Sequence, residues 1–477
     1  MTTEVTFRQY VELIADPRLR DNQTRKWVEQ YIADQLYPDG APSVLPFKVL
    51  VSEPWHLELE SSPPIESKPF ERFIVSLQLN DEAYDLILKY VGQNSQVMSA
   101  VGADLPLKST EHWCPRYATD PIFGNRNDAR QLMQVDYLSQ NGAEGENVNV
   151  VVVDRGLDKS YVDSFGGAKF GGGWTRGDLP KFPRLPKPGT TVGGHGMMIV
   201  RNILDIAPKA TIFDCPLLAA LPGHITNIES ATSDAASAYG KMIDDIEILR
   251  NNPTWQGPWI FVNAWAVYNR KSEKPPGHYS NRLEHILNAA VSRAVQNGID
   301  VVFCAGNCGQ FCPDPDCGPN DRGPGESILG ANGHKDVITV SAVRTDGIWL
   351  GYSSQGPGQP NLDPHKVKPD FCAPSQFCEM DDANAKNTGT SAACAITAGV
   401  VAALRSKWDS ATLPLDRLKT ILKETATKTE GGPELKDTAT PTEVGPEWRK
   451  RIGSGILNAK KAYDEIANPC GSRKAST

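Results

Sequence analysis

Residues 150–158 read VVVVDRGLD, four consecutive valines followed by an aspartate. A continuous run of β-branched residues predicts a strand that is buried on both faces of a parallel sheet. The apolar runs Trp259–Val267 and Val301–Cys304 are similar, and the apolar residues of the intervening stretch Leu283–Val295 share one helical face. Strands that alternate with helices predict an α/β fold with a doubly wound, mostly parallel sheet and helices on both faces.

Polar residues stand where two of these strands end. Asp154 follows the valine run, and Asn307 follows the run in VVFCAGN (301–307). Ligands of open α/β sheets bind outside the carboxyl ends of the strands, so both positions suit a functional site. Either residue taken alone is more often a turn former.

His195 and Ser391 begin two further candidate helices. His195 lies in GGHGMMIV (193–200), whose glycines permit close backbone approach, and Ser391 opens a stretch rich in Ala, Val and Gly (387–404). A hydroxyl group at a helix start lies beside unpaired N–H groups, which can stabilise an oxyanion. Taken alone, a structural histidine and an N-cap serine are the ordinary interpretations.

The four segments occur in the order Asp, His, Asn, Ser, and together they resemble the subtilisin-like serine protease family, the subtilases (peptidase family S8). The resemblance covers about residues 119–466. Its main motifs are Asp154-Arg155-Gly156, His195-Gly196, Ala305-Gly306-Asn307 and Gly389-Thr390-Ser391-Ala392-Ala393, with weaker matches at Ala207-Pro208-Lys209-Ala210, Tyr352–Pro357, Lys368-Pro369-Asp370 and Gly453–Ala459.

The resemblance implies a subtilisin-like fold and a role for each of four residues. Ser391 is expected to be the nucleophile, and His195 the general base and then the general acid. Asp154 is expected to orient the imidazole and to stabilise its cation. The Asn307 side chain and the Ser391 backbone N–H are expected to form the oxyanion hole.

The function that follows is a serine endopeptidase that hydrolyses peptide bonds through an acyl-enzyme, regulated and selective in action. An alternative is a catalytically impaired binding or scaffold protein on the same fold. Met197 and Met198 replace the family's usual Thr and second His, and Ala395 replaces a proline after the nucleophile. Arg155 stands where Thr or Ser is usual, and a cation there either faces Asp154 or is solvated.

The resemblance also predicts substrate-binding residues. The wall of the substrate pocket is expected from the strand through Ala264, Trp265 and Ala266, and Gly306 is a further candidate. Packing of Trp265 in the core is an equal alternative.

Four cysteines, Cys304, Cys308, Cys312 and Cys317, lie next to the predicted oxyanion hole. Their spacing lacks the C-x2-C pairs of zinc sites, so we predict no metal site. Cys304 is expected to be a buried small hydrophobe. The other three, with Cys372 and Cys378, are candidates for one or two disulfides that brace an active-site loop, or for free thiols.

Residues 1–118 are predicted to form a smaller α+β domain, followed by the protease domain at 119–468 and a tail at 469–477. Helices are expected at Phe7–Ile14, Lys26–Leu36 and Asp81–Val91, and strands at Phe47–Val51, Phe73–Leu79 and Val97–Val101. The domain is either a propeptide, as many subtilases carry, or a permanent domain that binds an activating or regulatory protein. Further along, the Gly- and Pro-rich stretch Phe165–Pro188 predicts a long loop.

Composition limits the partners. The chain has 477 residues, 49 basic and 57 acidic, for a formal charge of −8, and no long basic run, so nucleic-acid binding is not expected. No apolar run is long enough for a membrane span and no signal peptide is recognisable. We therefore predict a cytoplasmic protein without membrane contact. The cysteine cluster argues against the cytoplasm, because disulfides are unusual in that reducing compartment. The expected partner is a protein or peptide substrate. We expect no cofactor in the chemistry. Family members often bind calcium, so the resemblance allows a structural calcium ion, but no dense Asp/Asn/Gly loop supports one.

Overall fold

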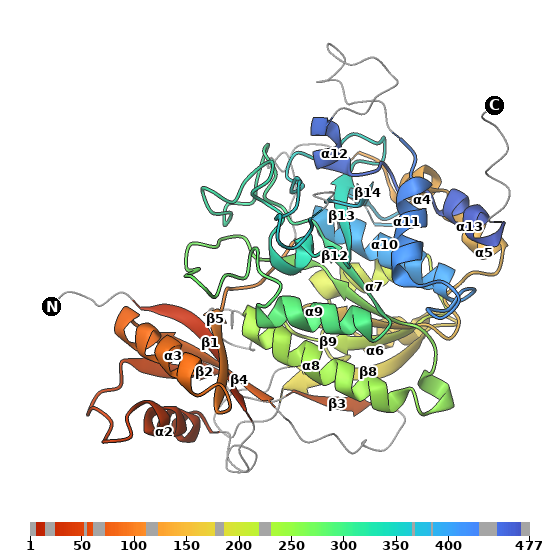
Figure 1. The fold of residues 1–477 in the computed structure, drawn as a ribbon. Coiled ribbons are helices and arrows are strands. Elements are labelled where there is room, and N and C mark those ends of the chain that lie inside the picture. The colour runs from red at the N-terminus through yellow and green to blue at the C-terminus, as the bar shows by residue number, and fades with distance from the viewer. Residues whose placement is uncertain are drawn as a thin grey trace.

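Eight strands form the central sheet, in the order β14-β13-β12-β10-β7-β9-β8-β3 (Figure 1). Neighbouring strands are parallel except at the edge, where β3 is antiparallel to β8. The bounds are β3 (Trp55–Leu59), β7 (Asn149–Val153), β8 (Lys169–Arg176), β9 (Thr211–Cys215), β10 (Trp259–Asn263), β12 (Ile299–Cys304), β13 (Ile338–Val343) and β14 (Phe371–Pro374). The computed structural model describes residues 6–14, 24–51, 55–60, 72–110, 123–176, 186–218, 230–364, 368–382, 385–428 and 446–468.

Helices cover both faces of this sheet. One face packs against α4 (Arg126–Met133), α5 (Asp136–Gln140), α6 (Lys159–Ser164), α7 (His195–Leu204), α10 (Gly389–Arg405), α11 (Leu415–Glu424), α12 (Pro446–Ile452) and α13 (Ala459–Ala467). The other face packs against α8 (Thr232–Leu249) and α9 (Ile286–Gln296), which lie together in front of the sheet in Figure 1. Short strands β11 (Trp265–Ala266), β15 (Phe377–Cys378) and β16 (Lys386–Asn387) lie outside the sheet.

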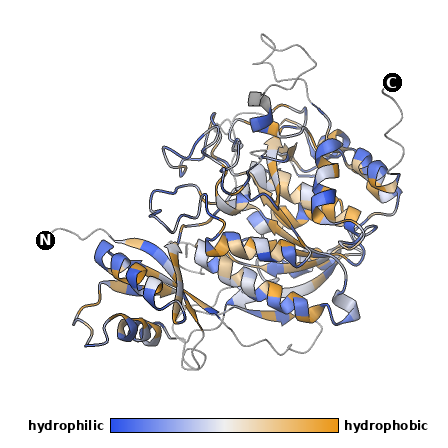
Figure 2. Cartoon of the chain, viewed as in Figure 1, coloured by the Kyte–Doolittle hydropathy of each residue, from blue (hydrophilic) through white to orange (hydrophobic). Residues whose placement is uncertain are grey.

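The valine run divides between these two faces. Val150 and Val152 pack with α7 and α10, whereas Val151 and Val153 pack with α8 and α9. Because both faces are covered, the strand needs apolar residues at every position. Figure 2 shows the same pattern as hydrophobic strands inside helices with hydrophilic outer sides. The predicted doubly wound α/β fold is therefore confirmed.

The start of the chain forms a second, smaller sheet. Its strands run in the order β2-β4-β1-β5 and all neighbours are antiparallel. The bounds are β1 (Phe7–Ile14), α2 (Arg25–Leu36), β2 (Phe47–Val51), β4 (Arg72–Leu79), α3 (Asp81–Gln93) and β5 (Met98–Ala103). Asn80 caps α3 by accepting a hydrogen bond from the Ala83 N–H at 2.9 Å. This is the smaller α+β unit that the sequence predicts.

The prediction of a helix at Phe7–Ile14 is wrong, because these residues form strand β1. The apolar spacing of Phe7, Val11 and Ile14 resembles a helical face, but Val11 and Leu13 are the residues that point into the small core. Pairing with β4 on one side and β5 on the other makes β1 an inner strand. Tertiary pairing has overridden the local spacing.

The prediction of one long loop at Phe165–Pro188 is also wrong, because Lys169–Arg176 forms strand β8. Its glycines lie where the neighbouring strands β3 and β9 approach closely. A Cβ on Gly172 would lie 2.2 Å from the Glu58 carbonyl oxygen in β3, and one on Gly173 would lie 1.9 Å from the Asp214 carbonyl oxygen in β9. Residues 177–185, with the proline-rich part of the prediction, lie outside the described residues.

The two units share strands and ion pairs. Strand β3 belongs to the first 118 residues by sequence but completes the edge of the large sheet. Strand β6 (Lys108–Ser109) pairs with β11 of the large unit. Arg8 of β1 forms an ion pair with Asp234 of α8, at 3.8 Å. In the described parts of the chain, no helix is both long and apolar enough to span a bilayer.

Replacing Gly173 by alanine tests the close approach of β8 to β9. The added methyl group would clash with the Asp214 carbonyl oxygen, so the free energy of unfolding should fall by about 1–3 kcal/mol. Urea denaturation measures this loss. Gly166→Ala is the matched control, since no atom lies within 4 Å of its added Cβ. Equal stabilities of the two variants would contradict the strand assignment.

Asp214 should make stability depend on pH. Burial raises the pKa of Asp214 from 3.8 to about 7, with a smaller contribution from Asp154, although its Oδ2 accepts hydrogen bonds from the Gly189 N–H at 2.9 Å and the Leu157 N–H at 3.3 Å. The folded chain therefore holds this proton more tightly than the unfolded chain. The resulting stability is complete below about pH 4 and is lost as the pH rises to about 7.

The test is urea denaturation of the wild type and Asp214→Asn between pH 4 and pH 8. Relative to the variant, the wild type should lose free energy of unfolding up to about pH 7 and then stay level. Asp163→Asn, which removes an exposed carboxylate, serves as the control. Parallel profiles of the wild type and Asp214→Asn would show that Asp214 does not carry the dependence.

Candidate active site

Asp154 and His195 meet at the carboxyl edge of the sheet. Asp154 follows β7, and His195 is the first residue of α7. The Asp154 Oδ1 and His195 Nδ1 atoms are 2.7 Å apart, and both side chains are buried, with exposed fractions of 1% and 0%. The Asp154 Oδ1 also accepts the Arg155 N–H at 2.8 Å. This arrangement fixes the orientation of the imidazole ring and leaves its Nε2 for chemistry.

The helix that presents His195 begins at a tight glycine turn. Gly193 and Gly194 have φ angles of +77° and +83°, which other residues rarely adopt. A Cβ on Gly196 would lie 2.1 Å from the Gly156 carbonyl oxygen, so a glycine lets α7 pack against the loop after Asp154.

The two methionines that depart from the family pattern hold α7 in place. The Met197 thioether accepts the Asp158 N–H at 3.0 Å, and the Met198 thioether accepts the Thr388 N–H at 3.3 Å. Sulfur is a weak acceptor, but these contacts join α7 to the loops that precede Ser391 and follow Asp154.

Ser391 lies in the first turn of α10, two residues after Gly389, whose φ is +66°. Its Oγ donates to the Ala264 carbonyl oxygen at 3.1 Å and shares a hydrogen bond with the Thr110 hydroxyl. The buried His195 Nε2 atom has no hydrogen-bond partner among the described residues. The serine hydroxyl is therefore turned away from the imidazole in this state.

Asn307 is oriented by a residue that the sequence analysis did not assign, Thr390. The Asn307 Oδ1 atom accepts from the Thr390 N–H at 3.0 Å and from its hydroxyl at 2.9 Å. With Oδ1 held, the Nδ2 amide group points the other way and donates to the Thr110 carbonyl oxygen at 2.6 Å. A buried N–H group that makes a short hydrogen bond can stabilise a developing oxyanion. The only signal in the sequence was that Thr390 is next to Ser391.

The residue that completes the site, Thr110, comes from the N-terminal unit. Strand β6 pairs antiparallel with β11, with Ser109 opposite Trp265 and Lys108 opposite Ala266. The Thr110 N–H then donates to the Ala264 carbonyl oxygen at 3.1 Å. Residues 107–110, read Leu-Lys-Ser-Thr, thus lie in the site as an extended strand with one carbonyl at Asn307. No motif in the sequence marks this segment.

The residues predicted to bind substrate have different roles. Ala264 and Ala266 contact the 107–110 segment through their backbones, whereas the Trp265 side chain is fully buried against Phe303 with ring centroids 5.1 Å apart. Gly306 donates its N–H to the Thr390 hydroxyl at 3.2 Å.

Gly389 and Arg155 also shape the space around the 107–110 segment. A Cβ on Gly389 would lie 1.6 Å from the Thr110 carbonyl oxygen, so this position must be glycine when the site is occupied. The Arg155 guanidinium donates to the Ser109 hydroxyl at 2.6 Å.

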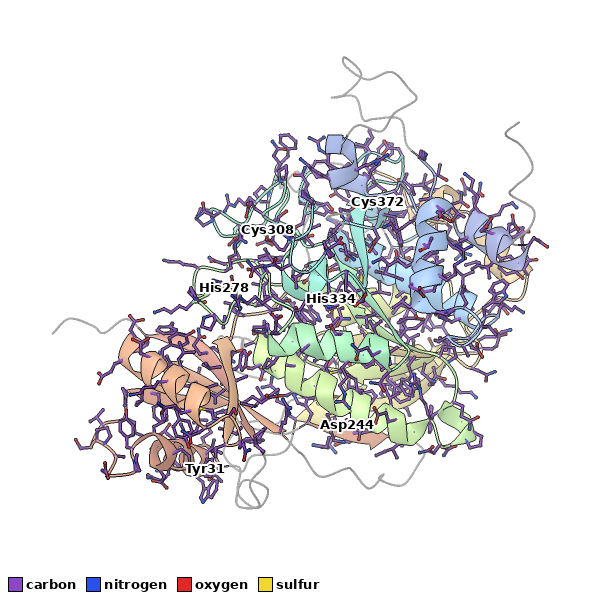
Figure 3. The ribbon with its side chains drawn as sticks, in the orientation of Figure 1. Tyr31, Asp244, His278, Cys308, His334 and Cys372 are labelled. Atoms are coloured by element: carbon purple, nitrogen blue, oxygen red, sulfur yellow. A yellow bond between two sulfur atoms is a disulfide. The ribbon has the colours of Figure 1, made fainter. Side chains whose placement is uncertain are left out.

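The cysteine cluster provides one disulfide, between Cys308 and Cys317. Cys304 is buried, and its burial raises the pKa of the thiol to about 12, as expected of a small hydrophobic residue. Cys372 and Cys378 are free thiols. Figure 3 shows Cys308 and Cys372 in separate parts of the molecule. Among the described residues, no group of three or more potential ligands forms a metal site.

Known proteins include several that are similar to this chain in sequence. Subtilisin DY of Bacillus licheniformis is 24% identical over 307 residues, which cover 62% of this chain and 89% of that protein. Subtilisin NAT of Bacillus subtilis subsp. natto is 26% identical over 218 residues, which cover 44% of this chain and 47% of that protein.

Among solved structures, the chain is similar to fervidolysin from Fervidobacterium pennivorans, a keratinolytic enzyme related to subtilisin. The TM-score is 0.53 at 17% identity, over 96% of this chain and 61% of that one, so this likeness concerns the fold alone. The Subtilase family model matches residues 145–455, which is more than half of the chain and includes Asp154, His195, Asn307 and Ser391. The chain therefore belongs to the subtilase family of serine proteases.

Proposed function

We propose that this chain is a serine endopeptidase in which Asp154, His195 and Ser391 act as the catalytic triad. The observation that carries the proposal is the position of Thr110. Its carbonyl oxygen accepts a hydrogen bond from the Asn307 amide, and its hydroxyl shares a hydrogen bond with the Ser391 hydroxyl. The Asn307 amide would polarise a peptide carbonyl in that position, and the proposed nucleophile, Ser391, lies beside it. Family membership supports hydrolysis of protein substrates.

The proposed reaction needs one change in this geometry. The Ser391 hydroxyl must rotate from the Ala264 carbonyl oxygen toward His195 Nε2, which then takes its proton as Oγ attacks the peptide carbonyl. Asn307 stabilises the resulting oxyanion, and His195 returns the proton to the leaving amine. Water then hydrolyses the acyl-enzyme on the same groups. This chemistry requires no cofactor.

The N-terminal unit is proposed to be the first substrate and inhibitor of the site. The pairing of the 107–110 segment with β11 and the Thr110 carbonyl at Asn307 support a substrate-like peptide whose scissile bond would follow Thr110. An intact chain is therefore blocked by its own strand, which supports a regulated enzyme and favours the propeptide interpretation of this unit. Binding of a regulatory protein through residues 1–118 remains the alternative.

An active-site label tests the triad. A fluorophosphonate should add once to the wild-type chain and not to Ser391→Ala, and His195→Ala should react on the order of 10⁶-fold more slowly. Ser139→Ala, which removes an exposed hydroxyl, is the matched control. Intact-mass spectrometry gives the readout.

A variant that opens the site makes this test decisive. Thr110→Pro removes the N–H that bonds to the Ala264 carbonyl oxygen, so labelling should be faster than in the wild type. If neither the wild type nor Thr110→Pro reacts while folded, the impaired-scaffold alternative is correct.

The position of self-cleavage tests the role of the N-terminal unit. The wild type should yield two fragments cut after Thr110, and Ser391→Ala should stay whole, because the Thr110 carbonyl is the one held at Asn307. The masses of the fragments locate the cut. A chain that accepts the label but stays whole would show that residues 1–110 form a permanent regulatory domain.

A further inference from the structure

The side chain of Lys108 is held by two acidic residues from a distant loop. Its ammonium group donates to Asp314 Oδ1 at 3.1 Å and forms a second, shorter hydrogen bond to Asp316 Oδ2. The same nitrogen lies 5.3 Å from the centre of the Tyr268 ring, within the range of a cation–π contact. Two carboxylates and one ring face therefore surround a single cation.

The loop that carries these acids is tied to the oxyanion residue. The Asp314 N–H donates to the Asn307 carbonyl oxygen at 2.9 Å, and the Cys317 N–H donates to the Asp314 carbonyl oxygen at 3.1 Å. The Cys308–Cys317 disulfide closes the loop. The position of the acids is thus fixed relative to the place where the peptide carbonyl lies.

The two acids differ in environment. Asp314 is buried, and its Oδ1 also accepts the Asp316 N–H at 3.0 Å, whereas the Asp316 side chain is 62% exposed. Burial opposes the charge of Lys108, but its hydrogen bonds to Asp316 and Asp314 raise its pKa above the ordinary value. Burial of the Asp314 carboxylate costs free energy unless a cation faces it. The surroundings therefore favour a positively charged side chain.

Lys108 reaches these acids because of backbone pairing. The pairing of β6 with β11 sets the register, and the Thr110 carbonyl at Asn307 sets which bond is presented. Any extended peptide that pairs with β11 in the same register places the side chain of its third residue before the cut beside Asp314 and Asp316. The contact is therefore available to other substrates as well as to Lys108.

We propose that Asp314, Asp316 and Tyr268 form a subsite for lysine or arginine at the third position before the cleaved bond. The subsite deepens the proposed endopeptidase function and rests on it. It directs the enzyme toward protein segments with a basic residue two positions before the one whose carbonyl is attacked. The disulfide-closed loop Cys308–Cys317 is then a specificity loop.

A peptide series with one changed position tests this selectivity in the wild-type protein after self-cleavage at Thr110 has freed the site. The parent is residues 105–113 of the chain, LPLKSTEHW, as an internally quenched peptide, with lysine, norleucine or glutamate at position 108. We expect kcat/KM for lysine to exceed that for norleucine about tenfold and that for glutamate further. The preference should shrink as salt is raised, since Asp316 is exposed.

Variants of the loop identify the cause. Asp316→Asn should lower the ratio of lysine to norleucine, and Asp316→Lys should make glutamate the better substrate. Asp336→Asn, which removes a carboxylate paired with Lys335, should keep the wild-type ratio. Equal ratios in the wild type and Asp316→Lys would overturn the proposal.

A second measurement does not require catalysis. In the Ser391→Ala chain, hydrogen exchange of residues 104–110 reports whether β6 stays paired with β11. Lys108→Glu should speed this exchange at least tenfold, and adding Asp316→Lys should restore the protection. Failure of the charge swap to restore it would overturn the subsite. A different result would overturn the endopeptidase function alone. In that case the charge swap restores the protection of residues 104–110, but no variant with Ser391 reacts with the label or hydrolyses a peptide.

Discussion

The site depends on parallel strands that end at the same edge of one sheet. Strands β7, β10 and β12 are neighbours, so the residues that follow them, Asp154, Ala264 and Asn307, lie close together although they are far apart in sequence. Helices α7 and α10 then begin at this edge and deliver His195 and Ser391. Each strand must be apolar on both faces, because helices cover the sheet from both sides.

At the same edge, the backbone of Ala264–Ala266 pairs with β6 of the N-terminal unit. This pairing needs no particular side chains, which is why the same backbone can pair with the chain's own segment and, in our proposal, with other peptides. Specificity must then come from the side chains beside the strand. Arg155 faces Ser109, and the Cys308–Cys317 loop faces Lys108.

Two errors of sequence interpretation share one cause. At Phe7–Ile14 the apolar spacing fits a helix, and at Lys169–Arg176 the glycines indicate a loop, yet both segments are strands. In each, long-range partners decide the structure: β4 and β5 surround the first, and β3 and β9 surround the second. Glycine in β8 is a requirement of that close packing rather than a sign of irregular backbone.

The sequence alone determined the fold class and the set of groups at the site, because buried strands and helix starts need particular residue types within a few positions of each other. The order of their motifs, which resembles that of the subtilases, singled out Asp154, His195, Asn307 and Ser391. Only the tertiary structure decided that Thr110 lies at Asn307, that Cys317 pairs with Cys308, and that Lys108 meets Asp314. Those contacts join segments through backbone pairing and loop closure, which leave no local pattern in the sequence.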